Sequence, residues 1–296
     1  MAASSAIRAV ARHVYLPGTY LVRVKRPHQP GAFRQLMTDD LALWMLIAAP
    51  GPGLRFLAGI AALFLSLWSV YEIGYCENDV CATRLEADPV VSAEFACFDT
   101  ARFTLKACMS AVLLALGGAL MIRPAAFPAT AAAWLAVLAA LRAVFWLYNR
   151  IDKTTRVWLY LVLHMFRTLA LAAVLPIGAP GMIAGVTQIV ARWQDYLCYR
   201  MARTAEGFRW RNSPLRLIQL LLFLLCLGTL ARAGEDVWCW RSAALLGWSF
   251  FLARKDIRVA LQSAHRLHRA AKELPAHEDL YDQGLAGRPA PERRSL

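Results

Sequence analysis

Long apolar stretches separated by short polar segments follow one another along most of this 296-residue chain. A helix needs about 20 apolar residues to cross the hydrocarbon core of a bilayer, and the stretches approach that length. Because a backbone in hydrocarbon must satisfy its own hydrogen bonds, stretches of this kind form helices. The pattern predicts membrane helices over residues 54–74, 103–122, 130–148, 157–175, 182–199, 215–230 and 237–253.

An earlier apolar piece, residues 41–49, is too short to span a bilayer comfortably. It follows Asp39 and Asp40 and stops at a Pro-Gly-Pro-Gly sequence, residues 50–53. We expect a half-helix, a re-entrant element or a tilted crossing that includes residues 33–37. Counted as a crossing, this piece brings the total to about eight transmembrane helices, and the alternative is seven.

The composition supports a membrane protein, since 58% of the residues are hydrophobic, against about 45–50% in soluble domains. We therefore expect an all-α polytopic membrane bundle over residues 36–255, with a basic arm at 1–35 and a polar tail at 256–296. The end of the tail is rich in Gly, Pro and charge, which predicts disorder. The seven cysteines show no C-x-x-C spacing, so we expect no zinc or redox role for them.

The charges of the loops predict the orientation of the chain. Lys and Arg gather in residues 1–35, 149–156, 200–216 and the tail, and are few or absent in 176–180 and 233–236. Positively charged loops stay in the cytoplasm, so we expect both termini there. Abundant Ala and Arg with few Lys suggest a bacterium, and hence its inner membrane. Nucleic-acid binding by the arm is disfavoured, because every later segment resembles a membrane span.

Carboxylates are costly beside a membrane helix, and an acidic stretch closes the span at 54–74. Glu72, Asp79 and Glu86 lie seven residues apart, so in a continuing helix they share one face. Together with Asn78 they offer hard oxygen ligands that suit Mg²⁺, which in turn suits phosphates. The alternative is a helix end that reaches into water.

Polar residues also form stripes inside later spans. The stripes consist of Arg142 and Asn149 in one span, Arg156, Tyr160, His164 and Arg167 in the next, and Gln188, Arg192, Asp195 and Tyr199 in the third. Charged groups at membrane depth face the bundle interior or a wet cavity, so we expect a polar pocket open to the cytoplasm. Arg167 lies about 16 Å along its helix from Arg156, near the middle of the bilayer.

Internal ion pairing is the alternative to such a pocket. The expected pairs are Glu72 with Arg142, and Asp195 with Arg192 or Arg167. A lone Arg at depth is costly, so we expect Arg167 to bind an acid of another helix, an anionic ligand, or both. Glu72 and Asp195 are the acids at suitable depth. The excess of Arg over acid favours an anionic guest.

Asn78-Asp79 after an early span, the later acids Glu86 and Asp88, and the basic loops together resemble the UbiA superfamily of intramembrane prenyltransferases. That resemblance implies an all-helical fold and Mg²⁺ held by two aspartate-rich motifs. In this chain Ala82 stands at the third position of the first motif and Glu86 at the fourth. The second motif is reduced to Asp195, with Tyr199 where the second acid would be.

By this resemblance the protein transfers a prenyl group from a prenyl diphosphate to an unknown acceptor. The implied metal ligands are Asn78, Asp79, Glu86 and Asp195. Asp195 or His164 supplies a base. The implied diphosphate-binding residues are Arg142, Arg156, Arg167 and Arg192, with Tyr160 and Tyr199 beside them. Trp146, Trp158 and Phe166 flank a carbocation, or else are packing and interface residues. The alternative functions are a transport or non-catalytic protein that binds a polyprenyl-phosphate lipid, and a membrane scaffold.

Overall fold

The structure is a computed structural model. It describes residues 15–27, 31–48, 53–85, 89, 91–152, 155–204, 214–234 and 239–273. The first 14 residues and the end of the tail therefore lie outside it, and the cytoplasmic position of both termini stays a prediction.

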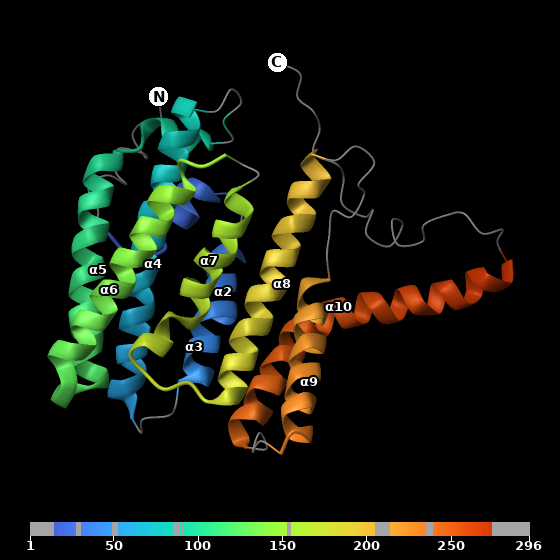
Figure 1. Ribbon diagram of the computed structural model, residues 1–296. Coiled ribbons are helices and arrows are strands. Elements are labelled where there is room, and N and C mark those ends of the chain that lie inside the picture. Colours follow the sequence, from blue (N-terminus) through green and yellow to red (C-terminus); the bar gives the residue numbers. More distant parts are fainter. Residues whose placement is uncertain are drawn as a thin grey trace.

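The described residues form helices, without strands, as the all-α expectation requires (Figure 1). The longer ones are α4 (Leu54–Leu85), α5 (Thr100–Ile122), α6 (Phe127–Tyr148), α7 (Arg156–Leu169), α8 (Ala179–Thr204), α9 (Leu215–Arg232) and α10 (Trp240–Glu273). Shorter elements are η1 (Leu21–Lys25), α2 (Gly31–Leu36), η2 (Met37–Leu41), α3 (Ala42–Ile47), η3 (Ala93–Cys97), η4 (Pro124–Ala126) and η5 (Ala170–Ala173).

Five of the described helices are long and apolar enough to cross a membrane. They are α4, α5, α6 with the preceding η4, α7 with the following η5, and α9. The membrane-helix character predicted from the sequence is therefore confirmed, whereas the total of eight crossings stays a prediction.

The short apolar piece near residue 41 belongs to a longer helical segment. Elements α2, η2 and α3 follow one another without a break from Gly31 to Ile47, about 26 Å at 1.5 Å per residue. Ala48 then pairs with Ile177 in an isolated β-bridge, so the segment ends beside the loop between α7 and α8. Figure 1 shows it running alongside α4, which returns in the opposite direction. The structure thus supports the expectation that the piece borrows preceding residues.

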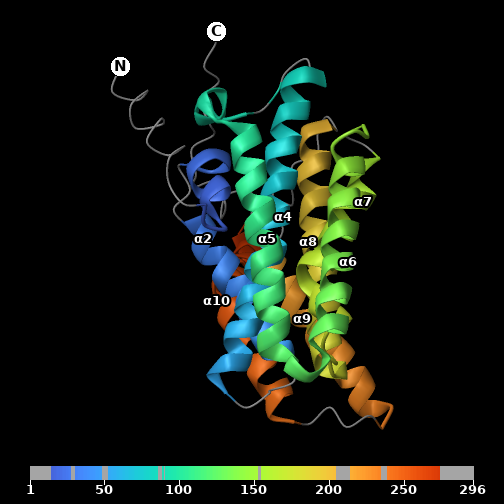
Figure 2. The ribbon, with the colours of Figure 1, turned by 90° about the vertical axis from the view of Figure 1, so that its left-hand side faces the viewer.

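Helix α4 packs closely on α5 (Figure 2) and also contacts α6 and α3. Small residues make this approach possible. A Cβ at Gly59 would lie 2.7 Å from Cγ1 of Ile122, and one at Gly118 would lie 2.6 Å from Cδ2 of Leu63. Among the largest fully buried side chains around α4 are Trp44, Trp68, Trp134, Phe64 and Phe145.

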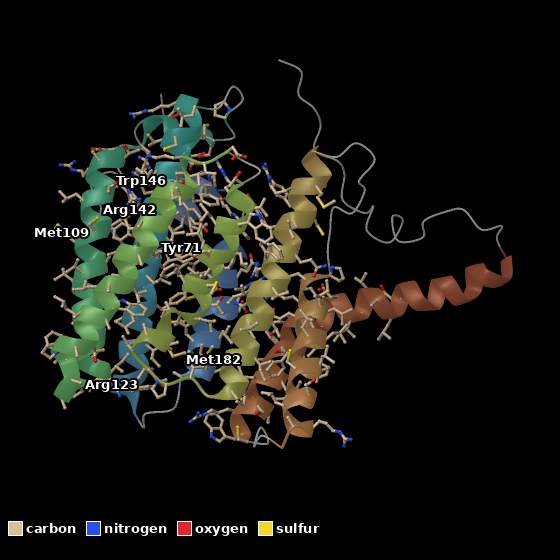
Figure 3. The ribbon with its side chains drawn as sticks, in the orientation of Figure 1. Tyr71, Met109, Arg123, Arg142, Trp146 and Met182 are labelled. Carbon is tan, nitrogen blue, oxygen red and sulfur yellow. The ribbon has the colours of Figure 1, made fainter. Side chains whose placement is uncertain are left out.

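Apolar side chains cover the outside of the bundle as well as its core. Met109 on α5 is 57% exposed and points away from the helices, whereas Tyr71 on α4 lies in the interior (Figure 3). Leu113 and Leu225 are each 66% exposed. An outer surface of this kind is stable against lipid and unfavourable in water, so it fits the membrane prediction.

Candidate functional site

Two adjacent carboxylates lie buried in the first helical segment. Asp39 and Asp40 are each 2% exposed and belong to η2, a single π-helical turn. Such turns are rare and occur often at functional sites. Neighbouring helices supply hydrogen-bond donors to its backbone, since the indole Nε1–H of Trp248 donates to Thr38 O (2.9 Å) and Gln188 Nε2 donates to Asp39 O (3.3 Å).

Three arginines from three different helices meet these two carboxylates. Arg167 of α7 forms an ion pair with Asp40, and Arg216 of α9 forms one with Asp39. Arg192 of α8 also pairs with Asp39, at 2.5 Å between Nη2 and Oδ2. We call these five residues the Arg–Asp cluster. It joins the first helical segment to α7, α8 and α9.

Two glutamines connect the edges of the Arg–Asp cluster. Arg216 Nη1 donates to Gln219 Oε1 (2.8 Å), Gln219 Nε2 donates to Gln188 Oε1 (3.3 Å), and Gln188 Nε2 donates to Asp40 Oδ1 (3.2 Å). Both glutamines are almost fully buried. The amides therefore fix the positions of the charged groups and leave them little freedom to move.

The hydrogen-bonded groups of the Arg–Asp cluster carry one positive charge more than negative, with three guanidinium groups against two carboxylates. The Nε–H groups of Arg167 and Arg192 are buried and have no hydrogen-bond partner among the described residues. Two further acids lie nearby. Asp256 is hydrogen-bonded to backbone amides of α9, and Asp195 forms no ion pair with a described residue. With these two acids the site holds four carboxylates and three guanidinium groups, so only the unused Nε–H donors suit an anion.

Aromatic side chains predicted for the site do gather beside the cluster. Tyr160 stacks on Tyr196 at 3.8 Å between ring centroids and meets His164 edge-on at 4.5 Å. Tyr148 and Tyr196 share a hydroxyl contact of 3.4 Å, and the Arg156 guanidinium lies 5.2 Å from the Tyr148 ring. Tyr199, also predicted, is 46% exposed at the edge of this group and stacks on Tyr196.

The acidic face of α4 is covered by the chain's own N-terminal segment. Tyr15 Oη donates to Glu72 Oε2 (2.6 Å), and Leu21 N donates to Glu72 Oε1 (2.9 Å). Burial and the neighbouring Glu72 raise the pKa of the Tyr15 phenol, so it remains a protonated donor. Glu72 is fully buried and satisfied by the protein itself.

Asp79, which follows Glu72 by seven residues on α4, is also hydrogen-bonded by the N-terminal segment. Tyr20 Oη donates to Asp79 Oδ2 (2.7 Å), and Lys25 Nζ forms an ion pair with Oδ1. Burial and the charge of Asp79 raise the pKa of the Tyr20 phenol. The Lys25 ammonium thus provides the positive charge that a bound cation would otherwise supply. Asn78 lies beside it, with Nδ2 at 3.5 Å from Asp79 Oδ1.

The predicted magnesium ligands are not seen to converge. Among the described residues no three His, Cys, Asp or Glu side chains form a group able to hold a metal. Glu86 lies outside the described residues. Asp79 faces the N-terminal segment, whereas Asp195 lies on α8, which packs on α7, α9, α10 and α3. Metal binding by these side chains stays a prediction.

The expected ion pair between Glu72 and Arg142 is wrong. Arg142 Nη1 instead pairs with Glu77 Oε2 at 2.6 Å, and Arg150 Nη1 pairs with the other oxygen at 3.0 Å. Glu72 and Glu77 are five positions apart, so they point to different sides of α4. Asn149 completes this second group, donating from Nδ2 to Glu77 Oε2 (3.3 Å).

The prediction that Arg167 binds an acid of another helix is confirmed, but its predicted partners are wrong. Asp40 takes the place of Glu72 and Asp195, and Arg192 pairs with Asp39 and not with Asp195. The sequence analysis left open a crossing that includes residues 33–37, and hence both aspartates, but it assigned them no partner. Two acids directly before an apolar stretch, inside a helix extended to Gly31, were the available signal.

Two of the predicted cation-flanking aromatics lie at the surface. Trp146 is 52% exposed beneath Arg150, at 4.6 Å from its guanidinium, and Trp158 is 62% exposed and packs on Trp193. Figure 3 shows Trp146 and Arg142 at the same end of the bundle. Exposed tryptophans near helix ends are typical of the membrane interface, so the alternative reading of these residues is the supported one.

Comparison with known proteins adds no relative to this picture, since no family model, curated protein or solved structure matches the chain.

Proposed function

We propose that this membrane protein binds the phosphate-bearing head group of an anionic lipid, such as a polyprenyl phosphate, at the Arg–Asp cluster. The observation that carries the proposal is the pair of buried Nε–H groups on Arg167 and Arg192 that have no partner among the described residues. Guanidinium groups recognise phosphate through charge-assisted hydrogen bonds, which are stronger than neutral ones.

The cluster lies at the level of Arg216, in the first turn of α9, a helix long enough to span the bilayer. Figure 1 shows α5 and α6 extending well beyond the start of α9, and counting along α7 places Arg167 near mid-bilayer. A lipid head group that binds the cluster therefore has to enter the interior of the bundle.

A purely structural role is the alternative explanation for the cluster, because it ties four parts of the bundle together. Buried ion pairs often contribute little net stability, since desolvation offsets the attraction between the charges. Yet a structural clamp has no need for unpaired donors. The two roles differ in what they predict for binding, and this difference can be measured.

The second candidate is Mg²⁺-dependent transfer of a prenyl group, as the resemblance to UbiA enzymes implies. The observation that favours it is the Asn78-Asp79 pair on the acidic face of α4. If Mg²⁺ binds there, Lys25 must first leave Asp79. In that case the Arg–Asp cluster neutralises the diphosphate, Asp195 or His164 takes a proton from the acceptor, and the acceptor is unknown.

Binding of farnesyl phosphate to the purified protein tests the first candidate. Arg192→Gln is the informative variant, because Asp39 keeps Arg216 as a partner and the fold is expected to survive. Losing one charge-assisted contact, worth about 1.5–3 kcal/mol, weakens binding by roughly 10- to 100-fold. The matched control is Arg232→Gln, which removes an exposed arginine at the far end of α9.

Equal affinities for wild type, Arg192→Gln and Arg232→Gln would show that the cluster does not bind the head group. Diphosphate release from farnesyl diphosphate, measured with and without Mg²⁺, separates the two candidates. Release that requires both Mg²⁺ and Asp79 supports the enzyme. Affinity without release supports the binding protein.

A further inference from the structure

A second group of charged side chains joins α4 to α6 and shares no residue with the Arg–Asp cluster. Glu77 of α4 accepts hydrogen bonds from Nη1 of Arg142 (2.6 Å) and Nη1 of Arg150 (3.0 Å). Asn149 donates to the same carboxylate (3.3 Å) and to Gly74 O (3.0 Å), which fixes the end of α6 against α4. We call Glu77, Arg142, Asn149 and Arg150 the Glu77 group.

The lengths of the two spans place the Glu77 group at a membrane surface. The 23 residues of α4 from Arg55 to Glu77 cover about 34 Å, and the 20 residues of α6 up to Trp146 cover about 30 Å. Both lengths match the ~30 Å of a hydrocarbon core. Figure 3 shows Arg123 at one end of the bundle and Arg142 with Trp146 toward the other. The Glu77 group therefore lies at one head-group layer.

The surroundings of the Glu77 group are positively charged. The group holds two guanidinium groups against one carboxylate. Residues 151–156, which follow it, add two basic residues and one acid, Asp152. Among the neighbouring acids of α4, Asp79 is paired with Lys25, and Glu72 points to another side of the helix. An excess of positive charge therefore remains at this surface.

The two arginines of the Glu77 group also have donors to spare. Their side chains are 38% exposed in Arg142 and 40% exposed in Arg150. Both use Nη1 alone in their hydrogen bonds to the described residues. Each guanidinium carries five N–H donors, so the Nη2 and Nε groups are left for a further acceptor. The group therefore combines positive charge, donors and access from outside.

An exposed face of α6 leads from the Glu77 group along the span. Its alanines follow one another at intervals of mostly three or four residues, so they share one side of the helix. They are Ala132, Ala136, Ala139, Ala140 and Ala143. Trp146 is 52% exposed on the same side, and the Arg150 guanidinium lies 4.6 Å from its ring. The order along the helix, apolar then aromatic then basic, matches the acyl, interfacial and phosphate layers of a lipid.

We propose that the Glu77 group and this face of α6 form a binding site for one anionic phospholipid. The lipid phosphate accepts hydrogen bonds from the Nη2 and Nε groups of Arg142 and Arg150, because guanidinium matches phosphate in charge and geometry. An acyl chain lies along the alanines, with the Trp146 indole at the level of the glycerol. The excess positive charge selects a lipid of net negative charge over a zwitterionic one. This site does not depend on the function proposed for the Arg–Asp cluster.

A phosphatidylglycerol probe with a photoactivatable diazirine in the middle of one acyl chain tests the proposal. The full-length protein is placed in phosphatidylcholine nanodiscs that contain a small fraction of the probe, and mass spectrometry identifies the labelled peptides after illumination. Lipid contacts the outer helices in general, so labelling of α9 serves as the reference in each sample. We expect residues 132–146 to be labelled several-fold more by this probe than by a phosphatidylcholine probe with the same acyl chains.

Arg150→Gln is the test variant, because Glu77 keeps Arg142 as a partner and the fold is expected to survive. An arginine near the surface strengthens the binding of anionic lipid by roughly fivefold, so we expect labelling of α6 to fall by about that factor. The matched control is Arg241→Gln. Arg241 also lies over an exposed tryptophan, 5.7 Å from the Trp240 ring, but belongs to α10, so its loss should leave the labelling of α6 unchanged.

Three results would overturn the proposal. Equal labelling of α6 by the two probes would show that the site does not recognise an anionic head group. Unchanged labelling in Arg150→Gln, or an equal loss in Arg241→Gln, would show that the Glu77 group does not hold the lipid. A face of α6 that neither probe labels would point to a second copy of the protein as its partner.

Discussion

The ion pair between Arg167 and Asp40 predicts a specific energetic coupling. Both side chains are largely buried, with 14% and 2% of their surface exposed. Breaking a buried pair by removing one partner costs about 3–5 kcal/mol, because an uncompensated charge remains. After Arg167→Ala, the hydrogen-bond donor left to Asp40 among the described residues is the Gln188 amide at 3.2 Å, so we expect a loss of about 3 kcal/mol in the free energy of unfolding. At roughly 2–4 °C per kcal/mol this lowers the melting temperature by about 6–12 °C.

A double-substitution cycle separates this pair from its neighbours. Adding Asp40→Ala removes the stranded charge, so we expect the double variant to recover part of the loss, with a coupling of about 0.5–3 kcal/mol. Glu72→Ala is the matched control, because Glu72 bonds Tyr15 and Leu21 and has no contact with Arg167. Its effect should add to that of Arg167→Ala. Melting of the detergent-solubilised variants gives both values, and additivity in the Asp40 cycle would refute the pairing.

Two further outcomes follow from close contacts in α4. Gly74→Ala places a Cβ 2.3 Å from Cδ1 of the buried Phe145, so we expect a loss of about 1–3 kcal/mol, whereas Gly117→Ala meets nothing within 4 Å and should melt no lower than wild type. Lys25→Met removes the ion pair to Asp79, so we expect a loss of about 1.5–3 kcal/mol in stability and faster proteolysis at residues 15–27. If Mg²⁺ binds Asp79, it should raise the melting temperature of this variant more than that of wild type. Equal responses of the two proteins to Mg²⁺ would argue against a cation site there.

Apolar patterning was sufficient to place most of the helices. The predicted spans 103–122 and 130–148 end at the same residues as α5 and α6. The span predicted over 54–74 begins with α4 but ends early, because α4 continues to Leu85. The predicted span ends at the first acids because they lower the hydropathy of the sequence. The helix continues because the N-terminal segment supplies hydrogen bonds to those acids, a tertiary effect that a local pattern does not contain.

Two arginines of the candidate site were predictable from the sequence, but their aspartate partners were not. Helical spacing identified Arg167 and Arg192 as inward-facing, because charges inside a span must avoid lipid. Their partners lie 127 and 153 residues away in the sequence, and no spacing rule states which helices pack together. The π-helical turn that presents Asp39 and Asp40 has no sequence signature comparable to a cap or a turn, so no role was predicted for these acids.

The distance along the chain between Asp39 and Arg216 has a consequence for synthesis. A ribosome adding roughly 5–20 residues per second makes Arg216, 177 residues later, about 9–35 seconds after Asp39. Arg167 and Arg192 are made late in that interval, so until then both carboxylates occupy a short, weakly apolar segment without any arginine of the cluster. The segment is therefore expected to settle in the bilayer only after α9 has been made, so that it reaches its final position later than helices that follow it in the chain.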